Sequence, residues 1–115
     1  MITGPAREIG AEMTSNPIVR ALSFTGSTEI GKLLMAQCAT TVKKVGLELG
    51  GNAPFVVLDD ADIDAAVAGA MIAKMRNGGA ACTAANRFVV AKKVATEFTD
   101  KFAKAMAALK VAPGL

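Results

Sequence analysis

Hydrophobic and polar residues along the chain follow two different periods, which predicts a mixture of strands and helices. Short apolar or loosely alternating segments predict strands at residues 18–25, 42–49, 53–58 and 86–92. Apolar residues spaced three or four apart predict helices at residues 28–39, 62–75 and 94–109. The order strand, helix, strand, strand, helix, strand, helix is typical of an α/β fold with a parallel sheet.

Local signals fix some of the expected boundaries. Ser27 or Thr28 is expected to cap the helix that follows, and the acidic start at Asp62 is expected to begin the next helix. The sequence changes character at Gly50-Gly51, which predicts a hinge and a domain boundary, with one unit at 1–50 and another at 51–115.

Composition bears on whether the chain is a self-sufficient domain. Of the 115 residues, 52% are hydrophobic, with five Phe and neither Trp nor Tyr. This favours a segment of a larger protein whose apolar surfaces are covered by other parts, while an Ala-rich helical domain is the alternative.

Charge and cysteine content exclude several classes of protein. The formal charge of +3 is scattered, and without a basic stripe or stacking aromatics a nucleic-acid module is excluded. The lysine pairs at 43–44 and 92–93 are expected at solvated ends of helices or strands. The longest uncharged run in a helical pattern, 65–73, is too short to span a membrane, and no signal peptide is visible. With two Cys and no His, zinc and disulfide frameworks are not expected, which favours a reducing, cytoplasmic setting.

Two motifs resemble ligand sites but lack essential residues. Gly26, Gly31 and Lys32 have the spacing of a P-loop, but Leu33 stands where a magnesium-binding Ser or Thr is needed. The aspartates at 59, 60, 62 and 64 suggest a calcium loop, but Ala65 and Met71 replace the required Gly and Glu. We therefore expect a turn whose helix N-terminus can meet a phosphate, with Gly31 serving close helix–strand packing, and aspartates that cap a helix.

Cys82 and Glu48 are the candidate reactive groups. Both lie in glycine-rich surroundings, where a thiolate can attack a carbonyl and a carboxylate can later activate water. For this role the Cys82 thiol needs a helix N-terminus or a nearby charge to lower its pKa, and we expect Glu48 to be partly buried. The alternatives are a buried, inert cysteine and a carboxylate facing water at a strand end, and Cys38 is expected in the core.

Three motifs occur in order: Phe24-Thr-Gly-Ser-Thr-Glu-Ile-Gly31, Glu48-Leu-Gly-Gly51 and Asn77-Gly-Gly-Ala-Ala-Cys82. Together they resemble the core of the aldehyde dehydrogenase family over essentially all 115 residues. The resemblance implies that residues 1–50 are the C-terminal part of a Rossmann-like NAD(P)-binding domain. Residues 51–115 would then be the N-terminal part of an α/β catalytic domain.

The resemblance also implies roles for individual residues. Cys82 would attack the aldehyde to give a thiohemiacetal, hydride would pass to NAD or NADP, and Glu48 would activate the water that hydrolyses the thioester. Gly26 and Ser27 would contact the dinucleotide, and Leu49 would lie beside the nicotinamide. The family usually has Gln and Phe at positions 80 and 75, where this chain has Ala80 and Met75.

Arg76 bears on the substrate. It stands where succinate-semialdehyde dehydrogenases have an arginine that grips the distal carboxylate, a task suited to the guanidinium group. The alternative is a surface arginine. Succinate semialdehyde is the aldehyde that the resemblance implies.

Family members are several times longer and, as the resemblance implies, homo-oligomeric. The upstream asparagine of the oxyanion hole and the adenosine pocket have no counterpart in these residues. Two functional hypotheses follow: a segment of an NAD(P)-dependent semialdehyde dehydrogenase, or a non-catalytic remnant that acts, if at all, only by associating with another chain.

Overall fold

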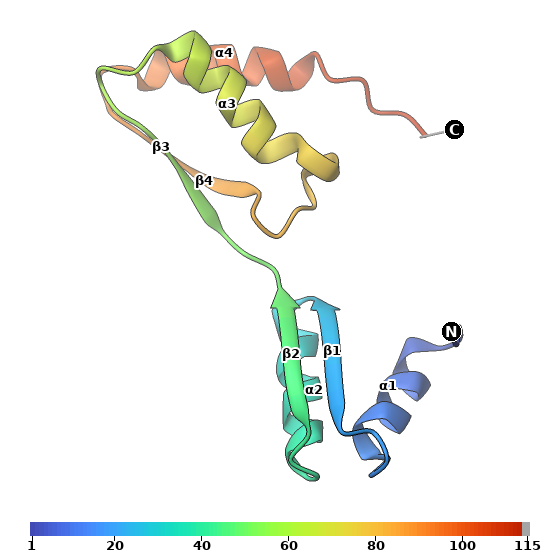
Figure 1. Cartoon of the computed structure of the whole chain (residues 1–115). Coiled ribbons are helices and arrows are strands. Elements are labelled where there is room, and N and C mark those ends of the chain that lie inside the picture. The colour runs from blue at the N-terminus through green and yellow to red at the C-terminus, as the bar shows by residue number, and fades with distance from the viewer. Residues whose placement is uncertain (114–115) are drawn as a thin grey trace. The chain divides into compact units, whose positions relative to one another are not determined.

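The computed structural model describes residues 1–113 and divides into two compact units, Met1–Gly50 and the part from Gly51 onward. Each unit contains a pair of parallel strands with helices packed against them (Figure 1). The predicted α/β class with parallel strand pairing is confirmed.

The first unit runs through four elements: α1 (Ala6–Ser15), β1 (Ala21–Gly26), α2 (Thr28–Ala39) and β2 (Lys44–Leu49). The two strands are paired in parallel from Ala21↔Lys44 to Gly26↔Leu49. Because parallel strands end at the same edge, the turn after β1 and the end of β2 lie next to each other.

Helix α1 was not predicted, and the strand after it begins later than expected. Thr14 of α1 is buried, and its hydroxyl donates to the carbonyl of Gly10 at 2.9 Å. Asn16 then forms a turn in which its side-chain oxygen accepts the N–H of Ile18 and its carbonyl accepts that of Val19. These bonds hold residues 18–20 outside the strand, so the predicted start at residue 18 is wrong.

The second predicted strand also begins late, at Lys44, because residues 42 and 43 close the end of α2. The N–H of Val42 donates to Ala39 and the N–H of Lys43 donates to Cys38, the pattern of a Schellman motif. Val42 takes the left-handed position with φ 50°. Cys38 is buried, as predicted.

Lys43 contradicts the prediction that both lysine pairs lie at solvated ends. It is 9% exposed, and its ammonium group donates to the carbonyls of Asn16 and Val19, each at 2.7 Å. The apolar stem is covered while the charge is met by two backbone oxygens of the α1–β1 connection. Lys44, Lys92 and Lys93 are exposed, as expected.

The second unit contains β3 (Ala53–Val57), α3 (Ile63–Met75), a 3-10 turn η1 (Arg76–Gly79), β4 (Ala85–Val90) and α4 (Ala95–Ala107). Strands β3 and β4 pair in parallel, with Ala53 opposite Ala85 and Pro54 opposite Arg87. Asn86 is therefore an extra residue on β4, a bulge that the sequence pattern did not predict.

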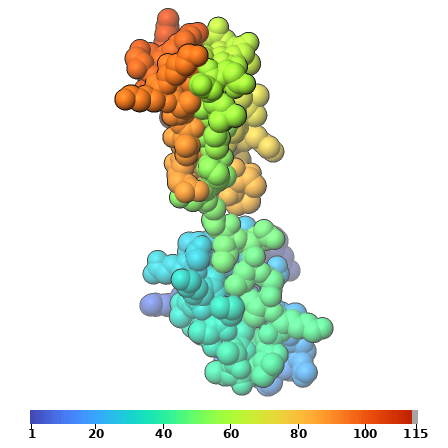
Figure 2. All heavy atoms as spheres, turned by 90° about the vertical axis from the view of Figure 1, so that its left-hand side faces the viewer, coloured from blue at the N-terminus to red at the C-terminus, as the bar shows by residue number. Residues whose placement is uncertain are grey.

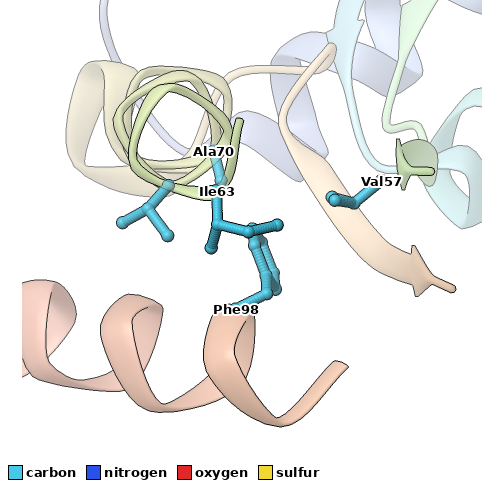
Figure 3. Close-up of a cluster of buried hydrophobic side chains, with 5 residues drawn as sticks. Val57, Ile63, Ala70 and Phe98 are labelled. Atoms are coloured by element: carbon cyan, nitrogen blue, oxygen red, sulfur yellow. The ribbon is translucent and has the colours of Figure 1, made fainter. Parts of the chain in front are cut away.

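The core of this unit lies between the strands and the two helices. Figure 3 shows Ile63 and Ala70 of α3 close to Phe98 of α4, with Val57 contributed by β3. The phenyl rings of Phe55, Phe88 and Phe102 surround Phe98, and the Phe88 and Phe102 ring centroids are 4.9 Å apart. In the space-filling view of Figure 2, the β3–α3 segment (green) lies against the β4–α4 segment (orange).

Polar contacts fix the ends and the outer sides of these helices. The side chain of Asp62 accepts the N–H of Ala65 at 3.1 Å, which confirms the predicted helix cap. Lys101 pairs with Asp64 at 2.7 Å and with Glu97 at 2.8 Å. Hydrogen bonds to Asp64 and then to Glu97 raise the pKa of Lys101 above its usual range.

The face of the β3–β4 pair that points away from the core carries exposed apolar side chains. Val56 and Val89 are register partners and are 58% and 56% exposed. Within residues 1–113, no helix is long and apolar enough to cross a membrane.

Candidate functional site

The turn from β1 to α2 is built by Gly26 and Ser27. The hydroxyl oxygen of Ser27 accepts the N–H of Ile30 at 3.3 Å, which confirms Ser27 as the helix cap. Both residues are exposed. The free N–H groups of the first helical turn and the helix dipole make this turn suitable for an anionic group.

Glu48 and Leu49 end the neighbouring strand. The register places Glu48 beside Thr25 and Leu49 beside Gly26, so four of the predicted site residues meet at the carboxyl edge of the β1–β2 pair. A Cβ on Gly31 would lie 2.7 Å from a methyl group of Leu49, so the predicted role of Gly31 in close packing is confirmed. Glu48 is exposed, so the partial burial expected for it is not provided by this unit.

Cys82 lies in the turn between η1 and β4, at the amino ends of β3 and β4. Within residues 51–113 no helix begins directly after the thiol, because η1 ends before Cys82 and α4 begins only at Ala95. The thiol is exposed, in contrast to Cys38, which excludes the alternative of a buried, inert cysteine.

The turn before Cys82 has an unusual backbone. Asn77, Gly78 and Gly79 all have positive φ, at 55°, 64° and 82°. Asparagine and glycine are the residues that adopt this conformation at least cost, which explains why they precede the thiol. The N–H of Ala80 donates to the carbonyl of Asn77 at 3.1 Å and closes the turn.

Three residues that the sequence did not place beside the thiol surround this turn. A Cβ on Gly51 would lie 2.5 Å from the carbonyl oxygen of Cys82, so only glycine fits there. The Asn86 side chain donates to the carbonyl of Gly51 at 3.0 Å and accepts from the ammonium of Lys74 at 2.7 Å. The one sequence signal was an asparagine at the first position of a predicted strand, since strands disfavour asparagine.

Arg76 begins η1 directly after α3, and it is exposed. It lies in the same unit as Cys82 and is separated from it by the left-handed turn. Gly26, Ser27, Glu48 and Leu49 belong to the first unit. Among residues 1–113, no cluster of three or more acidic or cysteine side chains could hold a metal ion.

Comparison with known proteins gives the family. Residues 1–115 match the model of the aldehyde dehydrogenase family along their whole length. The chain belongs to the aldehyde dehydrogenase family. A glutarate-semialdehyde dehydrogenase of Pseudomonas aeruginosa is 60% identical over the whole chain, which covers 24% of that relative. A succinate-semialdehyde dehydrogenase [NADP(+)] of Escherichia coli is 56% identical, again over the whole chain and 24% of the relative.

A solved structure agrees with this membership. The crystal structure of an NADP-dependent enzyme of Escherichia coli superimposes with a TM-score of 0.90 at 57% identity, covering 99% of this chain and 24% of the other. The predicted family and fold are therefore confirmed. The chain spans about a quarter of the length of these aldehyde dehydrogenases.

Proposed function

We propose that these residues are the part of an NAD(P)-dependent semialdehyde dehydrogenase that carries its nucleophile and its general base. The observation that carries the proposal is Cys82, an exposed thiol on a turn shaped by three left-handed residues, in a member of the aldehyde dehydrogenase family. Glycine and alanine occupy positions 78–81 before the thiol, so the preceding turn places no bulky side chain beside it.

In this proposal the Cys82 thiolate forms a bond to the aldehyde carbon and gives a thiohemiacetal. A bound NAD(P)+ would supply the hydride acceptor, and the resulting thioester stays on Cys82. Glu48 takes a proton from water as the water attacks the thioester, and the products are a carboxylic acid and the free thiol. The exposed Gly26-Ser27 turn at the start of α2 fits a dinucleotide phosphate, and Leu49 at the end of β2 is the proposed contact to the nicotinamide.

We further propose that the aldehyde carries a distal carboxylate, with succinate semialdehyde as the first candidate. Both curated relatives described above are named for semialdehydes of dicarboxylic acids. Arg76 is the proposed partner of the carboxylate, since an exposed guanidinium can pair with it through two hydrogen bonds.

The test is aldehyde oxidation by the whole protein that carries this segment. With succinate semialdehyde and NAD+ or NADP+, absorbance of the reduced cofactor should rise, and Cys82→Ala should abolish the rise while cofactor binding persists. Cys38→Ala is the control and should retain turnover, because that thiol is buried in the other unit. Turnover of Cys82→Ala within tenfold of the parent would reject the proposal.

A second possibility concerns the 115 residues by themselves. Because they span about a quarter of their relatives, we expect no turnover from this segment alone, as the alternative of a non-catalytic remnant also requires. Purified 115-residue protein, assayed as above, tests this expectation. Turnover that Cys82→Ala abolishes would show that the segment completes a site, for example between chains.

A further inference from the structure

Asn86 occupies a position in β4 that regular pairing would not give it. The register runs from Ala53↔Ala85 to Pro54↔Arg87 and leaves Asn86 without a partner on β3. A bulge of this kind re-aims the side chain of the extra residue. In this unit it directs an amide toward the start of β3, where Gly51 lies.

Both ends of the Asn86 amide are used. Its NH2 group donates to the carbonyl of Gly51 at 3.0 Å, and its oxygen accepts from the ammonium of Lys74 at 2.7 Å. Lysine can only donate and a carbonyl can only accept, so these two partners determine the orientation of the amide. The Lys74 stem is also close to the turn, because a Cβ on Gly79 would lie 3.8 Å from its Cε.

Gly51, in turn, lies against the residue that carries the thiol. A Cβ on Gly51 would be 2.5 Å from the carbonyl oxygen of Cys82 and 3.7 Å from its carbonyl carbon. The backbone of Gly51 therefore limits where the Cys82 peptide can move. The Asn86 NH2 group holds the Gly51 carbonyl by a hydrogen bond, and the Lys74 ammonium holds the Asn86 amide oxygen in the same way.

We propose that Asn86 is a positioning residue for Cys82, holding Gly51 against the turn that carries the thiol, with Lys74 as its support. The effect on turnover rests on the proposed function, whereas the ordering of the turn does not. A nucleophile that shifts by about 1 Å can lose on the order of 100-fold in rate, so a bond that fixes its backbone bears on kcat.

The test compares Asn86→Asp with Asn52→Asp in the whole protein. Aspartate at 86 keeps an acceptor for Lys74 but has no N–H for the carbonyl of Gly51. Asn52→Asp adds the same charge at an exposed neighbouring position and serves as the control. A second pair is Lys74→Met, which leaves the bond from Asn86 to Gly51 in place, and Lys92→Met, which removes an exposed lysine beyond β4.

Amide hydrogen exchange reports on the turn, and steady-state kinetics report on the chemistry. In Asn86→Asp, the amides of Ala80 and Ala84, which donate within the turn, should exchange about tenfold faster, while those of α4 stay protected. We expect kcat to fall about tenfold with KM within threefold of the parent. Lys74→Met should show the same changes to a smaller extent, and neither control should show them.

Unchanged exchange at Ala80 and Ala84 in Asn86→Asp would overturn the proposal, whether or not the protein oxidises aldehydes. Faster exchange with unchanged kcat would overturn the link to catalysis. If Asn86→Asp loses protection in α4 as well, that variant is unfolding, and the Lys74→Met and Lys92→Met variants are compared instead. Equal exchange of the Ala80 and Ala84 amides in these two variants would then overturn the proposal. A parent protein without aldehyde oxidation would reject the proposed function, and the exchange measurement would still decide whether Asn86 orders the turn.

Discussion

The backbone of Gly51 lies so close to Cys82 that a Cβ on Gly51 would be 2.5 Å from the Cys82 carbonyl oxygen. Gly51 was predicted only as part of a hinge, but the structure gives it a packing role beside the thiol. The preceding glycine differs, since a Cβ on Gly50 would meet no atom within 4 Å. The same substitution is therefore expected to affect the two adjacent glycines differently.

Gly51→Ala should lower the unfolding free energy of this unit by about 1–3 kcal/mol, because the methyl group displaces the Cys82 turn. Gly50→Ala should change it by no more than about 0.5 kcal/mol. Urea unfolding of the 115-residue chain, followed by the protection of α4 amides, measures both. Equal effects of the two substitutions would contradict the close contact.

The side chain of Lys43 should contribute more to the unfolding free energy than that of Lys44. Lys43→Met keeps an apolar stem but removes the ammonium that donates to the carbonyls of Asn16 and Val19, and Asn16 then retains only the N–H of Val19, which should cost about 1–3 kcal/mol of unfolding free energy in the first unit. Lys44→Met, at an exposed position, is the matched control. Denaturant midpoints of the two variants provide the comparison, and a loss shared by both would mean that net charge matters rather than these two bonds.

Val42 should be a site where a substitution increases stability. A β-branched residue with φ 50° is costly, and the C-terminal position of a Schellman motif favours glycine. Val42→Gly should raise the unfolding free energy by about 1 kcal/mol, as the side chain is 88% exposed and loses little packing. Val42→Ala, which keeps a Cβ, should gain less, and thermal unfolding of both variants would check the order.

Glu48→Gln should separate the two halves of the proposed reaction in the whole protein. If the carboxylate activates the deacylating water, a pre-steady-state burst of reduced cofactor should persist while steady turnover falls by about 100-fold or more. Rapid-mixing absorbance measures both phases. Loss of the burst along with turnover would place Glu48 in an earlier step.

Arg76→Ala should change substrate preference more than overall activity. A bidentate contact to a distal carboxylate suggests roughly 2–4 kcal/mol of discrimination, so kcat/KM should fall ~30- to 1000-fold for succinate semialdehyde. An uncharged aldehyde of similar length should lose much less. Equal losses on the two substrates would mean that Arg76 stabilises the structure around η1 and does not bind the carboxylate.

Elements with clear end signals were predicted well from the sequence. The helix at Thr28–Ala39 was predicted with the observed bounds, because Ser27 supplies a cap and apolar residues follow at helical spacing. The strand preceding it was predicted three residues too early, because Ile18 is apolar yet held in a turn by Asn16. Such side-chain bonds leave no trace in a hydrophobic pattern.

The surroundings of the candidate site were harder to predict. The motifs point to Cys82 and Glu48, but they do not show that the thiol lies on a turn at the amino ends of β3 and β4. The bulge at Asn86 and the burial of Lys43 depend on partners 35 and 24–27 residues away in the sequence. Long-range contacts of this kind follow from the fold and not from local periodicity.

The uncovered face of the β3–β4 pair has a consequence for synthesis and purification. Val56 and Val89 lie side by side and exposed on two strands that, within residues 1–113, pair only with each other. During folding, an exposed apolar strip on a two-stranded pair is a surface to which other chains or chaperones can bind. Expression of the segment alone should therefore gain more from co-expressed chaperones than from any change near Cys82.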